Sequence, residues 1–254
     1  MKKFMVVCAA ALLLVSSSAF ASVKIGIIGA MDVEVNTLKE AAEISRRVVK
    51  ADMEFLEGKL GSTDIVIVKC GMGKVNAGIC TQILIDSFNV SHVLNTGVAG
   101  SLNKNLEIGD VVVAADVVQH DFDVTPVGFR KGEIPYTGKV AFEADKELRA
   151  KAMKAVHEAA PDIKAIEGRI CTGDQFIETP AQAEAITSVF GGDCCEMESG
   201  AIAQVCYLNH VPFVIIRSIC DTMSGESAQN DYPEIEAEAA KLCASITQNM
   251  IKNF

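Results

Sequence analysis

Hydrophobic positions in this chain fall into short apolar runs, rich in Val and Ile, that alternate with longer amphipathic segments. The apolar runs have the length and composition of buried strands, whereas the amphipathic segments repeat their apolar residues every three or four positions, as helices do. We expect strands over residues 23–29, 54–60, 63–70, 92–96, 110–118, 165–172, 194–195 and 213–220. We expect helices over residues 34–43, 74–88, 145–159, 198–208 and 233–251, and another that begins at Pro180.

This alternation predicts an α/β fold with three layers, in which helices flank a mixed, mostly parallel central sheet. The sheet is mixed because Gly61 and Ser62 join two consecutive strands as a hairpin. One segment interrupts the alternation: residues 119–140 contain three glycines and two prolines and show little periodicity. Loops of this length in compact domains are usually functional or interfacial.

The first residues have the organisation of an export signal and not of the folded domain. Two lysines precede an apolar stretch at residues 4–15 that is too short to span a bilayer, and Ala19-Phe20-Ala21 has the small residues of a cleavage site. We expect a signal peptide over residues 1–21, a single domain over residues 22–254 and a periplasmic location. The alternative is an uncleaved signal that keeps the protein at the membrane.

Composition and charge limit the partners of this protein. The 254 residues carry a formal charge of −10 with scattered Lys and Arg, and they include no Trp and only three Tyr. Nucleic-acid surfaces need a clustered basic face or aromatic stacking residues, and anionic membranes repel an acidic protein, so we expect neither partner. Most cysteines lie within apolar runs and none forms a CxxC pair, which indicates buried thiols and no zinc site.

Four acidic residues stand near the predicted carboxyl ends of strands, namely Glu34, Glu196, Glu198 and Asp221. The pocket of an open α/β sheet forms at that edge, so these side chains could converge on one small molecule. Glu34 also suits the first turn of a helix, where the helix dipole favours a carboxylate whatever its function. Arg217 lies inside an apolar run, and a buried charge needs a partner, for which the glutamates are the candidates.

Glycine-bearing turns follow three of the strands, but none has the GxGxxG or GxxxxGK[ST] spacing of dinucleotide or P-loop sites. Taken in order, the motifs resemble those of the 5′-methylthioadenosine/S-adenosylhomocysteine nucleosidases, a family with the nucleoside phosphorylase fold. The resemblance spans nearly all of the chain beyond the signal. The matching motifs are KIGIIGAM at 24–31 with Glu34, GMGKVNA at 71–77, NTGVAG at 95–100, HDFDVT at 120–125, GDQFI at 173–177, EME at 196–198 and RSICD at 217–221.

The resemblance implies a hydrolase that cleaves the N-glycosidic bond of 5′-methylthioadenosine and S-adenosylhomocysteine, with 5′-deoxyadenosine as a further substrate, and releases adenine. It implies neither a metal nor a cofactor. Asp221 would be the general acid that protonates N7 of adenine. Glu34 would position and deprotonate the attacking water. Proton transfers of this kind each contribute roughly 10²–10⁴-fold to the rate.

The resemblance also implies a set of substrate-binding residues. Glu198 would bind the ribose hydroxyls, and Met197 would pack on the sugar. Phe176 would stack on adenine, with Ile177 offering backbone hydrogen bonds. Arg217 would orient a carboxylate. The remaining expected members of this set are Met31, Val98, Gly100 and Glu196.

Members of the family are homodimers in which each pocket borrows residues from the partner subunit. The corresponding segment here is residues 127–135, with Val127 and Pro135 expected at the 5′ end of the partner's substrate, and Tyr232 is expected to line the same alkylthio pocket. Val98 and Cys220 replace serines that are common in the family, and Val127 is smaller than the aromatic residue often found there. These departures leave the preferred 5′ substituent open.

Three alternative functions stay open at this point. A purine nucleoside phosphorylase needs cationic groups around phosphate, and Glu34 would repel that anion. A futalosine hydrolase shares the reaction type but releases a different base. An exported nucleoside-binding or surface-adhesion protein without turnover would have no use for an acid and a base on opposite sides of a scissile bond. The residues therefore favour the nucleosidase.

Overall fold

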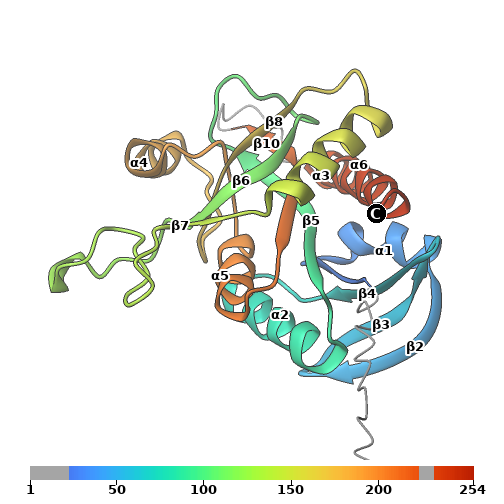
Figure 1. Cartoon of the computed structure of the whole chain (residues 1–254). Helices are drawn as coiled ribbons and strands as arrows, with labels where there is room; N and C mark the ends of the chain where they lie inside the picture. Colours follow the sequence, from blue (N-terminus) through green and yellow to red (C-terminus); the bar gives the residue numbers. More distant parts are fainter. Residues whose placement is uncertain (1–22, 223–231) are drawn as a thin grey trace, which may run out of the picture.

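A ten-stranded mixed sheet lies at the centre of the computed structural model, which describes residues 23–222 and 232–254 (Figure 1). The predicted signal peptide over residues 1–21 lies outside the described residues. The strands are β1 (Lys24–Gly29), β2 (Glu43–Lys50), β3 (Met53–Leu60), β4 (Thr63–Lys69), β5 (His92–Ser101), β6 (Val111–Gln119), β7 (Ala141–Glu143), β8 (Ala165–Thr172), β9 (Cys194–Glu196) and β10 (Phe213–Thr222). The helices are α1 (Asp32–Ala41), α2 (Lys74–Phe88), α3 (Lys146–Ala159), α4 (Pro180–Phe190), α5 (Ser199–Asn209) and α6 (Tyr232–Lys252).

Helices cover both faces of the sheet, which confirms the predicted three-layer α/β architecture (Figure 1). One apolar core lies between the sheet and the pair α2 and α5, and a second lies between the sheet and the group α1, α3 and α6. The central strand β1 is buried along almost its whole length, as expected for a parallel strand covered on both faces. None of the described helices has an apolar stretch long enough to cross a bilayer.

The pairing of the strands determines where the site can form. The strand order is β10-β6-β8-β9-β5-β1-β4-β3-β2, and β10 also pairs with β5, so that five of these strands close into a ring. The pairs β1/β4, β1/β5, β5/β10 and β6/β8 are parallel, whereas β2/β3 and β3/β4 are antiparallel. The carboxyl ends of β1, β5 and β10 therefore meet at one edge of the sheet. Asp221 of β10 stands beside Gly100 of β5 there.

Two sequence-based predictions of secondary structure were wrong. The segment after α1 was expected to be helical to residue 43, but the helix ends at Ala41 and Glu43 begins the edge strand β2. Most β2 residues are exposed on both faces, so no apolar alternation marks the strand, and its pairing with β3 holds it in place. The second error concerns β5, which was expected to end at Thr96 but continues to Ser101 through two glycines.

Gly97, the first of the two glycines in β5, has a packing function and does not form a turn. A Cβ atom on Gly97 would clash with the carboxylate of Glu34 and with the guanidinium of Arg217. The strand therefore uses glycine so that these two charged side chains can approach its backbone.

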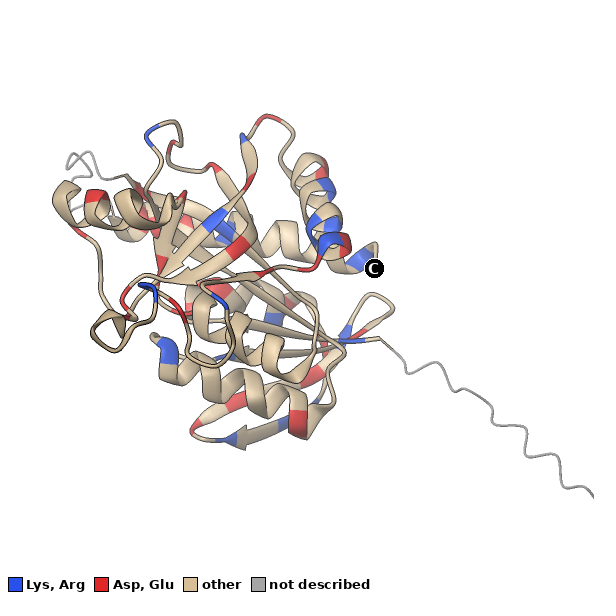
Figure 2. Ribbon diagram, turned by 60° about the vertical axis from the view of Figure 1, so that its left-hand side comes forward, with Lys and Arg blue, Asp and Glu red and all other residues tan. Residues whose placement is uncertain are grey.

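Acidic and basic residues are interspersed along the described helices and strands (Figure 2). Several of their ion pairs join two exposed side chains, such as Arg47 with Glu54 and Lys59 with Asp64. Exposed pairs of this kind contribute little to stability. The pairs around Arg217 differ from them because every member is buried.

Candidate active site

The charged residues that were proposed from the sequence line one cavity at the carboxyl edge of the sheet. Its walls come from the β1–α1 junction, the end of β5, the segment after β8, the end of β9, β10 and the start of α6. The eight described cysteines are free and buried, and no group of three or more His, Cys, Asp or Glu residues in the described chain is arranged to hold a metal ion.

Glu34 is fixed by backbone N–H groups at the start of α1. Its Oε2 accepts the N–H of Ala30 at 2.6 Å and that of Met31 at 3.0 Å, and its Oε1 accepts the N–H of Val98 at 3.1 Å. The side chain thus closes the first turn of the helix as the acidic member of a capping box. Burial raises the pKa of Glu34, and the opposing effects of Arg217 and the three N–H donors are smaller. A buried carboxylate with a raised pKa has the properties of a general base.

Arg217 lies at the centre of the buried charge network. Its Nη2 donates to Oε2 of Glu196 at 2.5 Å and to Oδ1 of Asn95 at 2.6 Å, and lies 3.7 Å from Oε2 of Glu198. Its Nη1 lies 3.9 Å from Oε1 of Glu34. Burial alone would lower the pKa of Arg217, but the three glutamates raise it above the ordinary value for arginine. The predicted carboxylate partner is confirmed.

Glu196 and Glu198 have different surroundings although only Met197 separates them. The Oε2 of Glu196 accepts the N–H groups of Glu198 at 3.0 Å and Ser199 at 2.8 Å, and Thr172 donates its hydroxyl to Oε1. Glu196 lines the cavity, but its carboxylate oxygens already accept hydrogen bonds from neighbouring protein groups. Glu198 accepts one hydrogen bond, from the N–H of Gly73 at 2.9 Å. Burial, together with the nearby charge of Glu196, raises the pKa of Glu198 to about 7.

Another part of the cavity lining is apolar and aromatic. Ile177 is buried, whereas the Phe176 side chain is 60% exposed and its ring lies edge-on to that of Tyr232, with centroids 6.4 Å apart. Asp221, at the end of β10, lines the same cavity.

Twelve of the fourteen predicted site residues line this one cavity. They are Met31, Glu34, Val98, Gly100, Phe176, Ile177, Glu196, Met197, Glu198, Arg217, Asp221 and Tyr232. Val127 and Pro135 do not line it within this chain. Val127 is 72% exposed in a short 3-10 turn of the long loop that projects from the molecule (Figure 1).

Three polar residues of the network were not proposed from the sequence. Asn95 accepts from Arg217 and donates its Nδ2 to the carbonyl of Ile28 at 2.9 Å, and Ser199 donates to Glu196 at 2.7 Å. Thr172 completes the cage around Glu196. The only available signal was a polar residue inside an apolar strand, as in Asn95-Thr96, which does not identify its partner.

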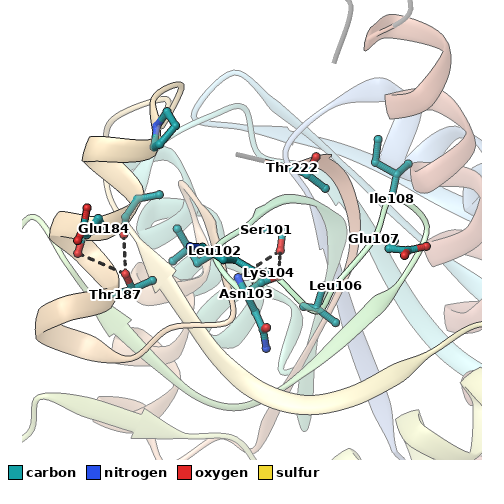
Figure 3. A pocket seen from close by; sticks show the side chains of 12 residues that line it. Ser101, Leu102, Asn103, Lys104, Leu106, Glu107, Ile108, Glu184, Thr187 and Thr222 are labelled. Carbon is teal, nitrogen blue, oxygen red and sulfur yellow. Dashed lines mark hydrogen bonds between the residues drawn. The ribbon is translucent and has the colours of Figure 1, made fainter. Parts of the chain in front are cut away.

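A larger cavity of about 920 Å³ lies next to the site (Figure 3). Ser101 and Thr222, which follow Gly100 and Asp221 on their strands, line this second cavity. Its charged side chains, Lys104, Glu107 and Glu184, are exposed, and Ser101 is hydrogen-bonded to Asn103. The buried charges required for acid–base chemistry therefore belong to the smaller cavity.

Comparison with known proteins agrees with this geometry. Residues 24–252 match the family model described as the phosphorylase superfamily. The chain is 40% identical to the 5′-methylthioadenosine/S-adenosylhomocysteine nucleosidase of Psychromonas ingrahamii, over 91% of this chain and 99% of the relative. The corresponding nucleosidase of Shewanella denitrificans is 44% identical over 83% of this chain and 89% of its own length.

Solved structures of two activities share the fold of this chain. The nucleosidase of Colwellia psychrerythraea, solved in complex with adenine, is 39% identical, has a TM-score of 0.85 and covers 91% of this chain and 96% of its own. The futalosine hydrolase of Helicobacter pylori is 31% identical, with a TM-score of 0.85, over 91% of this chain and 98% of its own. The chain belongs to the phosphorylase superfamily and, within it, to the family of 5′-methylthioadenosine/S-adenosylhomocysteine nucleosidases.

Proposed function

We propose that this protein hydrolyses the N-glycosidic bond of 5′-methylthioadenosine and S-adenosylhomocysteine, and of 5′-deoxyadenosine, with release of adenine. The observation that carries the proposal is that Glu34 and Asp221 line one cavity, which the sugar-binding candidates Met197 and Glu198 also line. The relatives named above, which align over nearly all of their own length, support the substrate class.

The proposed reaction assigns one proton transfer to each of two carboxyl groups. Adenine lies against Phe176 and Ile177, where Asp221 gives its proton to N7 as the bond between C1′ and N9 breaks and its electron pair moves into the base. Glu34 takes a proton from the water whose oxygen forms the new bond to C1′. Because three backbone N–H groups hold Glu34, its carboxylate is already oriented before the substrate binds.

The charge network gives the remaining residues their proposed functions. Glu198 accepts the ribose hydroxyls, and Arg217 keeps the carboxylates of Glu196 and Glu198 apart and fixed. Removal of adenine leaves positive charge on the sugar, and the anionic wall formed by Glu34 and Glu198 stabilises that charge.

A phosphorylase reaction is disfavoured by the same wall. The attacking phosphate would have to enter beside the buried carboxylates of Glu34 and Glu198, and the one arginine among the described lining residues is already engaged by glutamates. Repulsion between anions in a cavity with little water is large. Water, which is neutral, meets no such barrier.

Futalosine hydrolase is the second candidate because solved structures of that activity have the same fold at 31% identity. Both candidates are hydrolases, so the choice depends on the base and on the 5′ substituent. The experiment is to incubate the purified protein with methylthioadenosine, S-adenosylhomocysteine or futalosine and to follow base release by chromatography. Adenine from the first two, at kcat/KM at least tenfold above that for futalosine, supports the proposal. Faster cleavage of futalosine contradicts it.

We also propose a homodimer in which each subunit completes the other's cavity. Exposed apolar side chains form a stripe along the start of α2, at Met72, Val75 and Ile79, and Tyr207 and Leu208 extend it on α5, which packs against α2. Met72 also lines the cavity, so a partner bound to this stripe would border the substrate. The partner's Val127 and the partner's Pro135 would then reach its 5′ end.

Export by cleavage of residues 1–21 is a further proposal. The family match begins at residue 24, and the alignment with the Psychromonas ingrahamii relative covers 91% of this chain and 99% of that relative. Sequencing the amino terminus of the protein purified from its own cells tests the proposal. A start at Ser22 in a periplasmic fraction supports it, and an intact Met1 in the cytoplasm contradicts it.

A further inference from the structure

An additional carboxylate lines the cavity from helix α6. Glu236 lies four residues, or about one turn, after Tyr232 on this helix, and both side chains reach the cavity wall. Its position differs from those of Glu34 and Glu198, because it belongs to the wall formed by Tyr232 and Cys220.

Glu236 has no protein partner in the described chain. No described residue donates a hydrogen bond to it or forms an ion pair with it, whereas the other glutamates of the cavity are held by Arg217 or by backbone N–H groups. The charge of Glu236 nevertheless affects the pKa values of the neighbouring side chains Cys220 and Tyr232. Burial raises the pKa of Cys220 to about 11, and Glu236 acts in the same direction, as it does on Tyr232.

The charges of the cavity are strongly unbalanced. Its described lining contains five acidic side chains and one basic side chain, Arg217, which is engaged by glutamates. The proposed reaction uses Glu34, Glu198 and Asp221, and Glu196 is occupied by protein donors. Glu236 is the acidic residue that remains, and it stands beside the Tyr232 ring where the 5′ substituent is placed by the proposed function.

We propose that Glu236 is a specificity residue that binds an ammonium group on the 5′ substituent of the substrate, so that adenine nucleosides with an aminated tail are preferred over neutral ones of the same size. This inference rests on the proposed nucleosidase activity. S-Adenosylhomocysteine carries such an ammonium group in its tail, and methylthioadenosine does not.

The test uses two substrates of equal tail length. 5′-(2-Aminoethylthio)adenosine ends in an ammonium group, and 5′-propylthioadenosine ends in a methyl group at the same position. A hydrogen bond to a charged group is worth about a factor of ten or more, so we expect kcat/KM for the amino substrate to exceed that for the propyl substrate about tenfold. Glu236→Gln should bring the ratio close to one, mainly through a change in KM. Added salt should lower the ratio of the wild type by screening the charge of Glu236, and the ratio of Glu236→Gln should not depend on salt.

Glu238→Gln is the matched control because it removes the same charge from the exposed side of the same helix. It should keep the tenfold ratio. An unchanged ratio in Glu236→Gln overturns the inference, whether kcat/KM for the two substrates is retained or falls by the same factor. If the wild-type protein releases adenine from neither substrate, the proposed function fails instead, so the two failures are distinguishable.

Discussion

Nη2 of Arg217 lies 2.5 Å from Oε2 of Glu196, and both side chains are buried. Removal of one partner from a buried ion pair leaves an uncompensated charge, which costs more than the pair itself contributes. Here the loss of Arg217 would leave three neighbouring glutamates, Glu34, Glu196 and Glu198, without their shared counter-charge.

We therefore predict that Arg217→Met lowers the free energy of unfolding by about 3–5 kcal/mol, as measured by urea denaturation. The control is Arg149→Met, which removes a more exposed pair with Glu167 and should cost about 1 kcal/mol or less. If the two variants are equally stable, the buried network has no special energetic importance.

Gly97 is predicted to tolerate no side chain. The added Cβ of Gly97→Ala would displace the Glu34 carboxylate or the Arg217 guanidinium, so kcat should fall by about 10²-fold or more through misplacement of the base. Gly78→Ala on α2 is the control, because its Cβ would approach no atom closer than 3.9 Å. The control should keep its activity and gain up to about 1 kcal/mol of stability from helix propensity. Full activity of Gly97→Ala would contradict the described geometry.

Glu198 makes the stability depend on pH in a direction unusual for a carboxyl group. Burial and the charge of Glu196 raise the pKa of Glu198 to about 7, whereas the pKa of a glutamate in an unfolded chain is about 4.3. Between these values the folded protein holds a proton that the unfolded chain has lost. The contribution of this group is therefore complete at low pH and is lost as the pH rises through about 7.

We predict that the free energy of unfolding of the wild type falls relative to that of Glu198→Gln as the pH rises from about 5 to 7, by at most about 1.4 kcal/mol per pH unit. Urea denaturation at several pH values measures this difference. The exposed Glu238→Gln variant should follow the wild type throughout. A constant difference between wild type and Glu198→Gln would show that Glu198 titrates normally.

The apolar stripe on α2 leads to a prediction about assembly. Val75 is 72% exposed, so Val75→Glu should leave the fold intact but shift the protein from dimer to monomer in sedimentation velocity. The rate of adenine release should fall when the dimer is lost, because the partner's Val127 and the partner's Pro135 no longer complete the cavity. Val49→Glu, on the edge strand β2 and 66% exposed, introduces the same charge elsewhere and should remain dimeric. A monomeric wild type would exclude the shared cavity.

The sequence was sufficient to predict the main elements because their signals are local. The buried run of β1 and the capped start of α1 lie within twelve residues, and a charge such as Arg217 in an apolar strand requires a partner wherever it is. Strand β2 could not be predicted, since its order comes from pairing with β3 and not from its own pattern.

The residues that hold the charged side chains of the site could not be predicted either, because their contacts join distant parts of the sequence. Asn95 and Ser199 are 104 positions apart and meet only because β5 and the start of α5 fold together. Gly97 resembled a turn because the sequence cannot show that two charged side chains fill the space above it. The positions of Val127 and Pro135 against a second subunit depend on assembly and stay a prediction.

The most direct test of the central claim is the sugar product formed from methylthioadenosine in the presence of inorganic phosphate. We predict adenine and free methylthioribose, at the same rate with and without phosphate, with losses of about 10²–10⁴-fold in kcat for Glu34→Gln and for Asp221→Asn. The exposed Glu40→Gln variant on α1 should match the wild type. A sugar 1-phosphate, or adenine release that requires phosphate, would contradict the assignment of Glu34 as the base that activates water.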